Sequence, residues 1–417
     1  MKVELSALAT ATLWFLLVWL IASATVGLGY RRALREPAPP DPPTWPRFGV
    51  LVPLRGADPY LAEALRSVLA QDYPDFELRV VVDSANDPAW PIAARVLEEA
   101  PPDLSVGLTA LRERRQTCSL CCSNLLQGLE ELSPACELVT VAAADTLLPR
   151  DWLRRLARRM ADPQVGTTLG NRWYLPPPGS MGGLVRQLWN AGAVPFMWYA
   201  GIPWSGAMAH RRAALEEGRL AEVWARSMVE DVSLVRPLRA SGQRLAFAPE
   251  LFVVNREATD LPGLWRFLRR QLLWTRLYHP GWHQVLFNAA CTLASLVLPC
   301  LAVGEALVRG DLASGAAVVA GCGLQLLGLG LAIMLIQQRL APRLGVARQE
   351  ARMPLRGLPR LLVGMLLSQA IYVAVVAVVA VTRRVSWRGA DYEVLGPERI
   401  RLLRDEAPTT LAPGVSL

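Results

Sequence analysis

Charged residues are absent from four long stretches of this 417-residue sequence. The stretches cover approximately residues 7–30, 286–304, 312–337 and 361–382. A bilayer core is crossed by about 20 apolar residues in a helix, so each stretch is long enough to span a membrane. With 52% hydrophobic residues and a mean hydropathy of +0.26, the composition excludes a purely soluble protein. The charged region between the first two stretches has the size of an ordinary domain, which excludes a protein made only of spans.

A complete set of metal-binding side chains is also missing. The chain has seven cysteines and three histidines. Cys118, Cys121 and Cys122 lie close together in the sequence, but no second Cys-x-x-Cys pair and no nearby histidine completes a four-ligand zinc site. We expect reduced, packed thiols. The net charge of +8 comes without a base-stacking or groove-reading motif, so we expect no nucleic-acid partner and a basic face toward anionic lipid.

The arginines that flank the apolar stretches predict the orientation of the chain. Arg31, Arg32 and Arg35 follow the first stretch, so the positive-inside rule places the globular domain in the cytoplasm and the N-terminus outside. Residues 22–24 resemble a signal-peptidase site, but we expect an uncleaved anchor because arginines follow the run. The prediction is an integral membrane protein with a cytoplasmic domain, in the inner membrane of a bacterium.

The fourth apolar stretch conflicts with this rule. If it crosses the bilayer, Arg383, Arg384 and Arg388 lie outside. Either the segment is re-entrant or the rule is broken, and the sequence leaves both alternatives open.

The order of segments predicts the domain organisation. A linker with six prolines in ten positions, 37–46, is expected to be stiff and extended. We divide the chain into an N-terminal transmembrane anchor (1–30), a proline-rich linker (31–47), a cytoplasmic domain (48–262), an interfacial helix (263–283), three C-terminal membrane segments (284–382) and a tail (383–417).

Within the domain, short buried-strand patterns alternate with helical patterns. Strands are expected at 48–53, at 77–82 ending at Asp83, and at 138–144 ending at Asp145, with a helix at 60–70. This alternation predicts an α/β fold with a mixed, mostly parallel sheet that helices cover on both faces. In such sheets ligands bind beyond the carboxyl ends of the strands, where both aspartates lie.

Four short motifs occur in a fixed order. They are Val80-Val-Val-Asp83-Ser-Ala-Asn-Asp87, Ala143-Ala-Asp145, Val229-Glu230-Asp231 and Arg270-Gln271-Leu-Leu273-Trp274. Taken singly, the first is also typical of an ordinary turn, the third of an acidic helix N-terminus, and the fourth of an interfacial helix. Together with the tail sequence Ser386-Trp-Arg-Gly-x-x-Tyr392, they resemble inverting family 2 glycosyltransferases, and most of all the ceramide glucosyltransferase-like group, family 21.

The resemblance implies a GT-A-like nucleotide-sugar-binding domain and a hexosyltransferase that moves a sugar, with inversion, from a UDP-sugar such as UDP-glucose to a membrane lipid hydroxyl. It implies Mg²⁺ or Mn²⁺ as cofactor. The implied roles are nucleoside binding for Asp83, metal and diphosphate binding for Asp145, approach to the donor sugar for Gly206, general base for Asp231 beside Glu230, and acceptor or diphosphate contacts for Arg270, Gln271, Trp274 and Arg276.

Three positions depart from the family pattern. Ala143 replaces the first aspartate of an Asp-x-Asp motif, Leu273 replaces an arginine, and Cys121 replaces a lysine. Arg276, about one helical turn from Leu273, is a candidate replacement cation. These departures keep a second hypothesis open, a catalytically degenerate protein that binds lipid or assembles with a partner. A polysaccharide synthase is a further alternative, but four apolar segments are few for an export channel.

Overall fold

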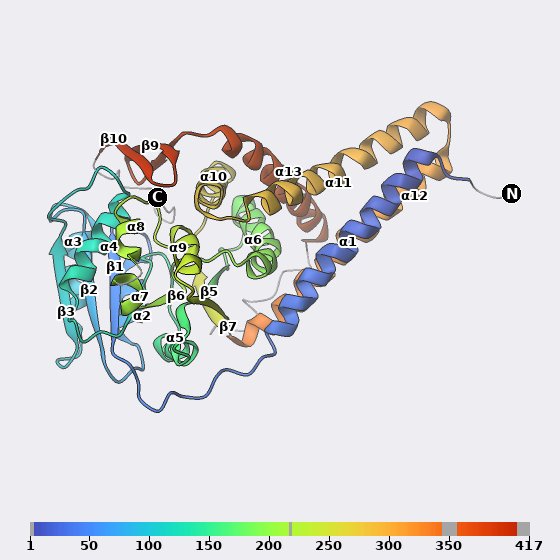
Figure 1. The fold of residues 1–417 in the computed structure, drawn as a ribbon. Helices are drawn as coiled ribbons and strands as arrows, with labels where there is room; N and C mark the ends of the chain where they lie inside the picture. Colours follow the sequence, from blue (N-terminus) through green and yellow to red (C-terminus); the bar gives the residue numbers. More distant parts are fainter. Residues whose placement is uncertain (1–3, 217–218, 344–356, 407–417) are drawn as a thin grey trace.

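The computed structural model describes residues 4–216, 219–343 and 357–406. A globular domain is built on a seven-stranded sheet with the order β3-β2-β1-β4-β6-β5-β7 (Figure 1). The strands are β1 Phe48–Leu54, β2 Phe76–Val82, β3 Ser105–Ala110, β4 Leu138–Val141, β5 Val165–Tyr174, β6 Met208–Arg211 and β7 Arg244–Asn255. β6 runs antiparallel to both of its neighbours, and the other neighbouring pairs are parallel. The expected α/β fold with a mixed, mostly parallel sheet is confirmed.

Helices cover both faces of the sheet, because alternate residues of each strand point to opposite cores. Val50 and Val52 of β1 pack with α2, α3 and α5, whereas Leu51 packs with α4, α7, α8 and α9 on the other face. The domain helices are α2 Leu61–Leu69, α3 Ala89–Leu97, α4 Leu120–Glu131, α5 Trp152–Met160, α6 Met181–Ala200, α7 Arg212–Glu216, α8 Leu220–Trp224, the 3₁₀ turn η1 Val232–Leu234, α9 Val235–Ala240 and α10 Leu261–Tyr278.

The strand expected at 138–144 is shorter in the structure. β4 ends at Val141, because its sheet neighbour β1 pairs with residues 138–141 only. Asp145 therefore follows β4 in a loop instead of ending the strand, and this loop places it nearer to β5 and β7.

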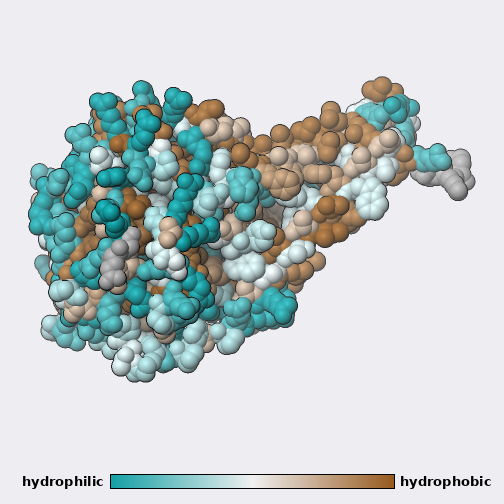
Figure 2. Space-filling view, viewed as in Figure 1, coloured by the Kyte–Doolittle hydropathy of each residue, from teal (hydrophilic) through white to brown (hydrophobic). Residues whose placement is uncertain are grey.

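Four long apolar helices match the four charge-free stretches in composition and length. They are α1 Ala7–Ala33, α11 Trp282–Arg309, α12 Leu312–Leu340, which continues into the 3₁₀ turn η2 Ala341–Arg343, and α13 Leu358–Val381. Helices α1, α11 and α12 extend away from the domain as one arm, and apolar residues dominate its surface (Figures 1 and 2). Two glycines of α12 bring it close to α1: a Cβ on Gly321 would lie 2.5 Å from Leu13, and one on Gly328 would lie 2.9 Å from Leu20.

Helix α13 differs from the other three, because both of its ends contact the globular part. Near its start, Arg360 donates to the carbonyl of Gly179 at 2.7 Å, just before α6. At its end, Arg276 of α10 donates to the carbonyls of Val379 and Thr382 at 2.6 Å. Between these points α13 packs on α6 and α10, and the Cβ of a substituted Gly364 would touch Leu188 of α6.

After α13 the chain returns to the domain as a three-stranded antiparallel sheet. Its strands are β8 Arg384–Trp387, β9 Ala390–Gly396 and β10 Arg399–Asp405. Two contacts hold this tail sheet against α4 and the segment before it: Leu120 N donates to the Tyr392 hydroxyl at 3.1 Å, and Leu402 N donates to the Gln116 carbonyl at 3.1 Å.

We expect the C-terminus to lie on the same side of the membrane as the globular domain, since both ends of α13 contact that domain. In a bacterial host, green fluorescent protein fused to the C-terminus should fluoresce, and alkaline phosphatase fused after Gly310, at the far end of the arm, should be active. A fluorescent fusion after Arg343 is the control for a cytoplasmic site. A dark C-terminal fusion together with an active C-terminal phosphatase would show instead that α13 crosses the bilayer.

Candidate functional site

Two hollows in the described part of the chain bring candidate site residues together. The first, the polar pocket, is a cavity of about 180 Å³ at the carboxyl ends of β1 and β4, closed by α4, α10 and the tail sheet. Its chemistry-bearing residues are Arg55, Cys121, Asp145, Arg172, Tyr174, Arg186, Trp204, Glu230, Asp231, Glu257, Arg270, Gln271, Trp274, Trp387, Arg388 and Tyr392. Five arginines and four carboxylates in so small a space make it a site for a charged ligand.

Asp231 is held in a fixed orientation at the pocket wall. It caps η1: its Oδ1 accepts from its neighbour Val232 N at 2.5 Å, and its Oδ2 accepts from Ser205 N at 2.9 Å. Burial, and then the charge of the adjacent Glu230, raise the pKa of Asp231 to about 7. A carboxyl that titrates near neutral pH and is locked by backbone amides suits a general base.

Glu230 is buried beside Asp231. Burial raises its pKa above the usual range. The thiol of Cys121, at the position where the resemblance implied a lysine, donates to Glu230 Oε2 at 3.8 Å. A neutral thiol therefore stands where a cation was expected, and Cys121 does line the polar pocket.

Asp145 lies in the pocket with its charge already paired. Arg172 Nη1 donates to its Oδ2 at 2.8 Å, and Asn255 Nδ2 donates to the same oxygen at 3.2 Å. Ala143 contributes no carboxylate, and a Cβ on Gly206 would lie 3.7 Å from Ala143 and 3.5 Å from Arg172. Gly206 thus borders this corner, and its approach to a donor sugar stays a prediction from the resemblance.

These residues are a poor fit for the divalent cation that the resemblance implied. Hard cations take several oxygen ligands. Here only one carboxylate is present at the expected position, and a guanidinium already pairs with it. In the ranges that the structure describes, no cluster of three or more His, Cys, Asp or Glu side chains is arranged to hold a metal. Mg²⁺ or Mn²⁺ at Asp145 stays a prediction from the resemblance.

Asp83 follows β2 as expected, but its carboxylate lies behind the pocket wall. It is 5% exposed, forms an ion pair with Arg55, and accepts from Asn124 Nδ2 at 3.4 Å. Arg55 lines the pocket and also pairs with Asp405 of β10 at 2.7 Å. In this arrangement Asp83 does not line the pocket itself but orients Arg55, which does.

Helix α10 presents one face to the pocket. Arg270, Gln271 and Trp274 line it, whereas Leu273 is buried in the apolar core. Arg276 lies outside the pocket: it donates to the carbonyls at the end of α13. Residues three apart on a helix share a face, and Leu273 points away from the pocket. Arg276, on the same face, therefore does not supply the cation in place of the missing arginine.

Sequence reasoning missed Arg172 and Arg388. Arg388 belongs to the tail sequence 386–392, which was noted but given no role, and it enters the pocket from the β8–β9 turn. Its Nη2 donates to Asp58 Oδ2 at 2.6 Å. Arg172 on β5 carries no sequence signal of its own, and its guanidinium lies over the Trp204 ring, 5.4 Å from the centroid.

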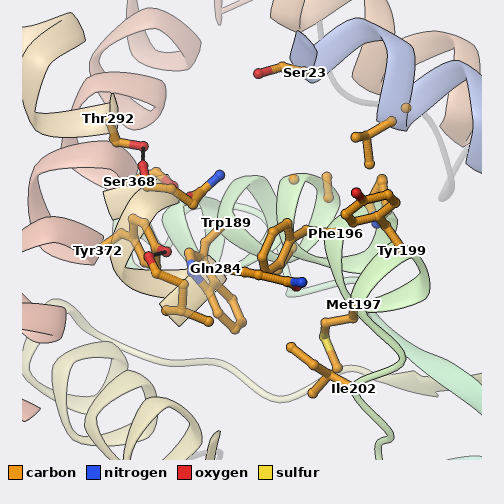
Figure 3. Close-up of a pocket in the computed structure, with 18 of the residues that line it drawn as sticks. Ser23, Trp189, Phe196, Met197, Tyr199, Ile202, Gln284, Thr292, Ser368 and Tyr372 are labelled. Carbon is orange, nitrogen blue, oxygen red and sulfur yellow. Dashed lines mark hydrogen bonds between the residues drawn. The ribbon is translucent and has the colours of Figure 1, made fainter. Parts of the chain in front are cut away.

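The second hollow, the apolar cavity, has a volume of about 770 Å³ and lies between α1, α6, α10, α11, α12 and α13. Figure 3 shows Trp189 and Phe196 of α6 between Tyr372 of α13 and Tyr199 of α6, with Gln284 beside them and Ser23 of α1 above. Apolar side chains from helices that also face the bilayer make this cavity suitable for a lipid chain.

The two hollows meet at four residues. Trp204, Asp231, Gln271 and Trp274 line both of them. The candidate base thus lies where a water-soluble, charged ligand and a lipid can reach the same point.

Comparison with known proteins agrees with this architecture. Ceramide glucosyltransferases of Komagataella phaffii and Pyricularia oryzae are 31% identical over 91 residues and 33% identical over 94 residues, or 22% and 21% of this chain. The matched segments span less than a fifth of those relatives, 18% and 19%. A solved mannosyltransferase from Pyrobaculum calidifontis, in complex with GDP-Man and Mn²⁺, is 22% identical and has a TM-score of 0.53 over 89% of this chain and 98% of that one. This likeness shows a shared fold.

The family profile described as Glycosyl transferase family 21 matches residues 12–400. That range includes most of the anchor helix, the seven-stranded sheet, the polar pocket, the other apolar helices and most of the tail sheet. The resemblance inferred from the four motifs is confirmed, and the chain belongs to glycosyltransferase family 21.

Proposed function

We propose that this glycosyltransferase moves a hexose, with inversion, from a nucleotide-sugar to the hydroxyl of a membrane lipid. The observation that carries the proposal is the junction of the polar pocket and the apolar cavity at Asp231. The ceramide glucosyltransferases among the similar proteins favour UDP-glucose as donor and a ceramide-like lipid as acceptor.

Asp231 acts as the general base. A lipid hydroxyl is a weak nucleophile until a positioned carboxylate takes its proton while it attacks the anomeric carbon. Ser205 N and Val232 N fix both oxygens of Asp231, so the carboxylate needs no reorientation during the reaction. An attack from the cavity side, opposite the leaving diphosphate in the polar pocket, gives inversion at that carbon.

The donor occupies the polar pocket. Its nucleoside end lies toward Arg55, which pairs with Asp83, and Asn124 in turn donates to Asp83. Its sugar lies near Gly206 and Trp204. Arg270 and Gln271 lie toward the diphosphate, and Trp274 separates this end from the acceptor. The contacts of Asp145 do not suit a resident cation, so no step is assigned to a metal.

The acceptor chain occupies the apolar cavity, with its hydroxyl at Asp231. The globular domain lies in the cytoplasm, where nucleotide-sugars are available, and the arm of α1, α11 and α12 anchors it in the bilayer. Helix α13 is then re-entrant or interfacial, which keeps Arg383, Arg384 and Arg388 on the cytoplasmic side and satisfies the positive-inside rule.

Activity should rise with pH and reach half of its plateau near the raised pKa of Asp231, about 7. Below that pH the carboxyl holds a proton and cannot accept another, so kcat falls as pH falls. Glu230→Gln removes a neighbouring negative charge, lowers the pKa of Asp231, and should move the ascending limb to lower pH. Asp231→Asn should lower kcat by roughly 10²-fold or more. The measurement is kcat against pH for transfer of labelled glucose from UDP-glucose to extracted lipid. A pH profile of Glu230→Gln identical to that of the unaltered protein would contradict the assignment of Asp231 as the base.

Gly192→Phe should obstruct the acceptor without changing the donor site. Gly192 lines the apolar cavity, and no atom lies within 4 Å of the Cβ that a side chain would add, so a benzyl group can enter the open space. We expect KM for the lipid to rise about tenfold or more, while the Kd of UDP-glucose stays unchanged. Gly323→Phe on α12, an exposed glycine with equally open surroundings outside the cavity, is the matched control. Equal KM values in both variants would place the acceptor elsewhere.

A further inference from the structure

Two arginines from distant parts of the chain line the polar pocket. Arg270 comes from α10 and Arg388 from the turn between β8 and β9. Burial, followed by the positive charges of Arg388 and Arg266, lowers the pKa of Arg270 to about 10. No carboxylate of the described residues forms a salt bridge with Arg270, so its charge lacks a close counterion.

The backbone holds Arg388 in an unfavourable conformation. Arg388 has φ 50° and Gly389 has φ 78°, the left-handed pair that a two-residue hairpin turn of the primed type requires. Glycine adopts this region freely, but arginine does so at a cost. The main chain and side chain of Arg55 lock the turn: Arg55 Nε donates to the Arg388 carbonyl, and the Arg388 guanidinium donates back to the Arg55 carbonyl. Strained residues of this kind cluster at functional sites.

The corner where a cation would sit already holds a cation. Arg172 pairs with Asp145 at 2.8 Å, and the Trp204 ring supports its guanidinium from the other side. Ala143 supplies neither charge nor ligand. A guanidinium here serves one electrostatic purpose of a metal, because it places a fixed positive charge beside the diphosphate position.

We propose that Arg270 and Arg388 bind the diphosphate of the nucleotide donor and that Arg172 occupies the place of the divalent cation, so that donor binding is independent of metal. This inference rests on the proposed function and specifies the donor subsite. It also gives the tail sheet a direct role in that subsite.

The chemistry balances without a metal. The bond between the anomeric carbon and the diphosphate oxygen breaks, and its electron pair leaves with the nucleoside diphosphate. The acceptor oxygen forms the new bond to that carbon, and its proton goes to Asp231. Guanidinium groups form bidentate hydrogen bonds with phosphate oxygens and stabilise the charge that develops on the leaving group.

Isothermal titration of UDP into the full-length protein in detergent tests the inference. We expect the same Kd, within about threefold, in EDTA and in Mg²⁺ or Mn²⁺. Arg270→Gln and Arg388→Asn should each weaken binding about tenfold or more in EDTA, because each removes a charged hydrogen-bond donor. Asparagine tolerates the left-handed region at residue 388. Arg401→Gln, an exposed arginine on β10 in the same tail sheet, is the matched control and should bind as the unaltered protein does.

The outcomes separate this inference from the proposed function. Binding that requires metal, or binding in EDTA that neither arginine variant weakens, overturns the inference and leaves a nucleotide-sugar transferase standing. No binding of UDP, UDP-glucose or GDP under any metal condition overturns both.

A second variant tests the same inference by introducing metal dependence into UDP binding. Ala143→Asp combined with Arg172→Ala adds a carboxylate and frees Asp145, so Mg²⁺ should then tighten UDP binding about tenfold or more. Unchanged binding with and without Mg²⁺ in this variant would show that Arg172 does not stand in place of the cation.

Discussion

The carboxylate of Asp231 lies where two different environments meet, and the rest of the structure depends on that position. On one side is a small pocket crowded with guanidinium and carboxylate groups, and on the other is a larger cavity lined by apolar side chains. Under the proposed function each substrate fits one hollow only, because a diphosphate is costly to bury among apolar groups and a lipid chain gains nothing among charged ones. Asp231, the proposed base, lines both hollows and so stands at their boundary.

The packing of α10 and α13 creates this boundary. Helix α10 directs Arg270 and Gln271 to the pocket while its other face, with Leu273, joins the core beneath α13. Helix α13 begins and ends against the globular part, held by Arg360 and Arg276. Because its C-terminal end stays beside the domain, the tail sheet can return to the pocket and deliver Arg388 there.

Much of the architecture was predictable because its signals are local. The absence of charge predicted four helices, and two of them begin at the expected residues, 7 and 312. The alternation of strand and helix patterns predicted a mostly parallel sheet with its ligand site at the carboxyl ends. Pairing of Asp145 with Arg172, the burial of Asp83 behind Arg55, and the placement of Arg276 at the end of α13 were not predictable, since each depends on contacts between segments far apart in the sequence.

The departures from the family pattern illustrate the same division. From the sequence alone, three positions indicate the loss of site residues: Ala143, Cys121 and Leu273. A motif shows which residue is missing, but not which residue from elsewhere in the chain occupies the space. In the structure, Leu273 is a core residue, and the pocket gains arginines from β5 and from a tail more than 100 residues beyond α10. The sequence by itself determined the α/β fold and the four long apolar helices, since composition and periodicity are read from neighbouring residues, and its four motifs carried the resemblance to the family. Only the tertiary structure decided which charges face one another around the polar pocket and where the apolar cavity lies, because those follow from how distant segments pack.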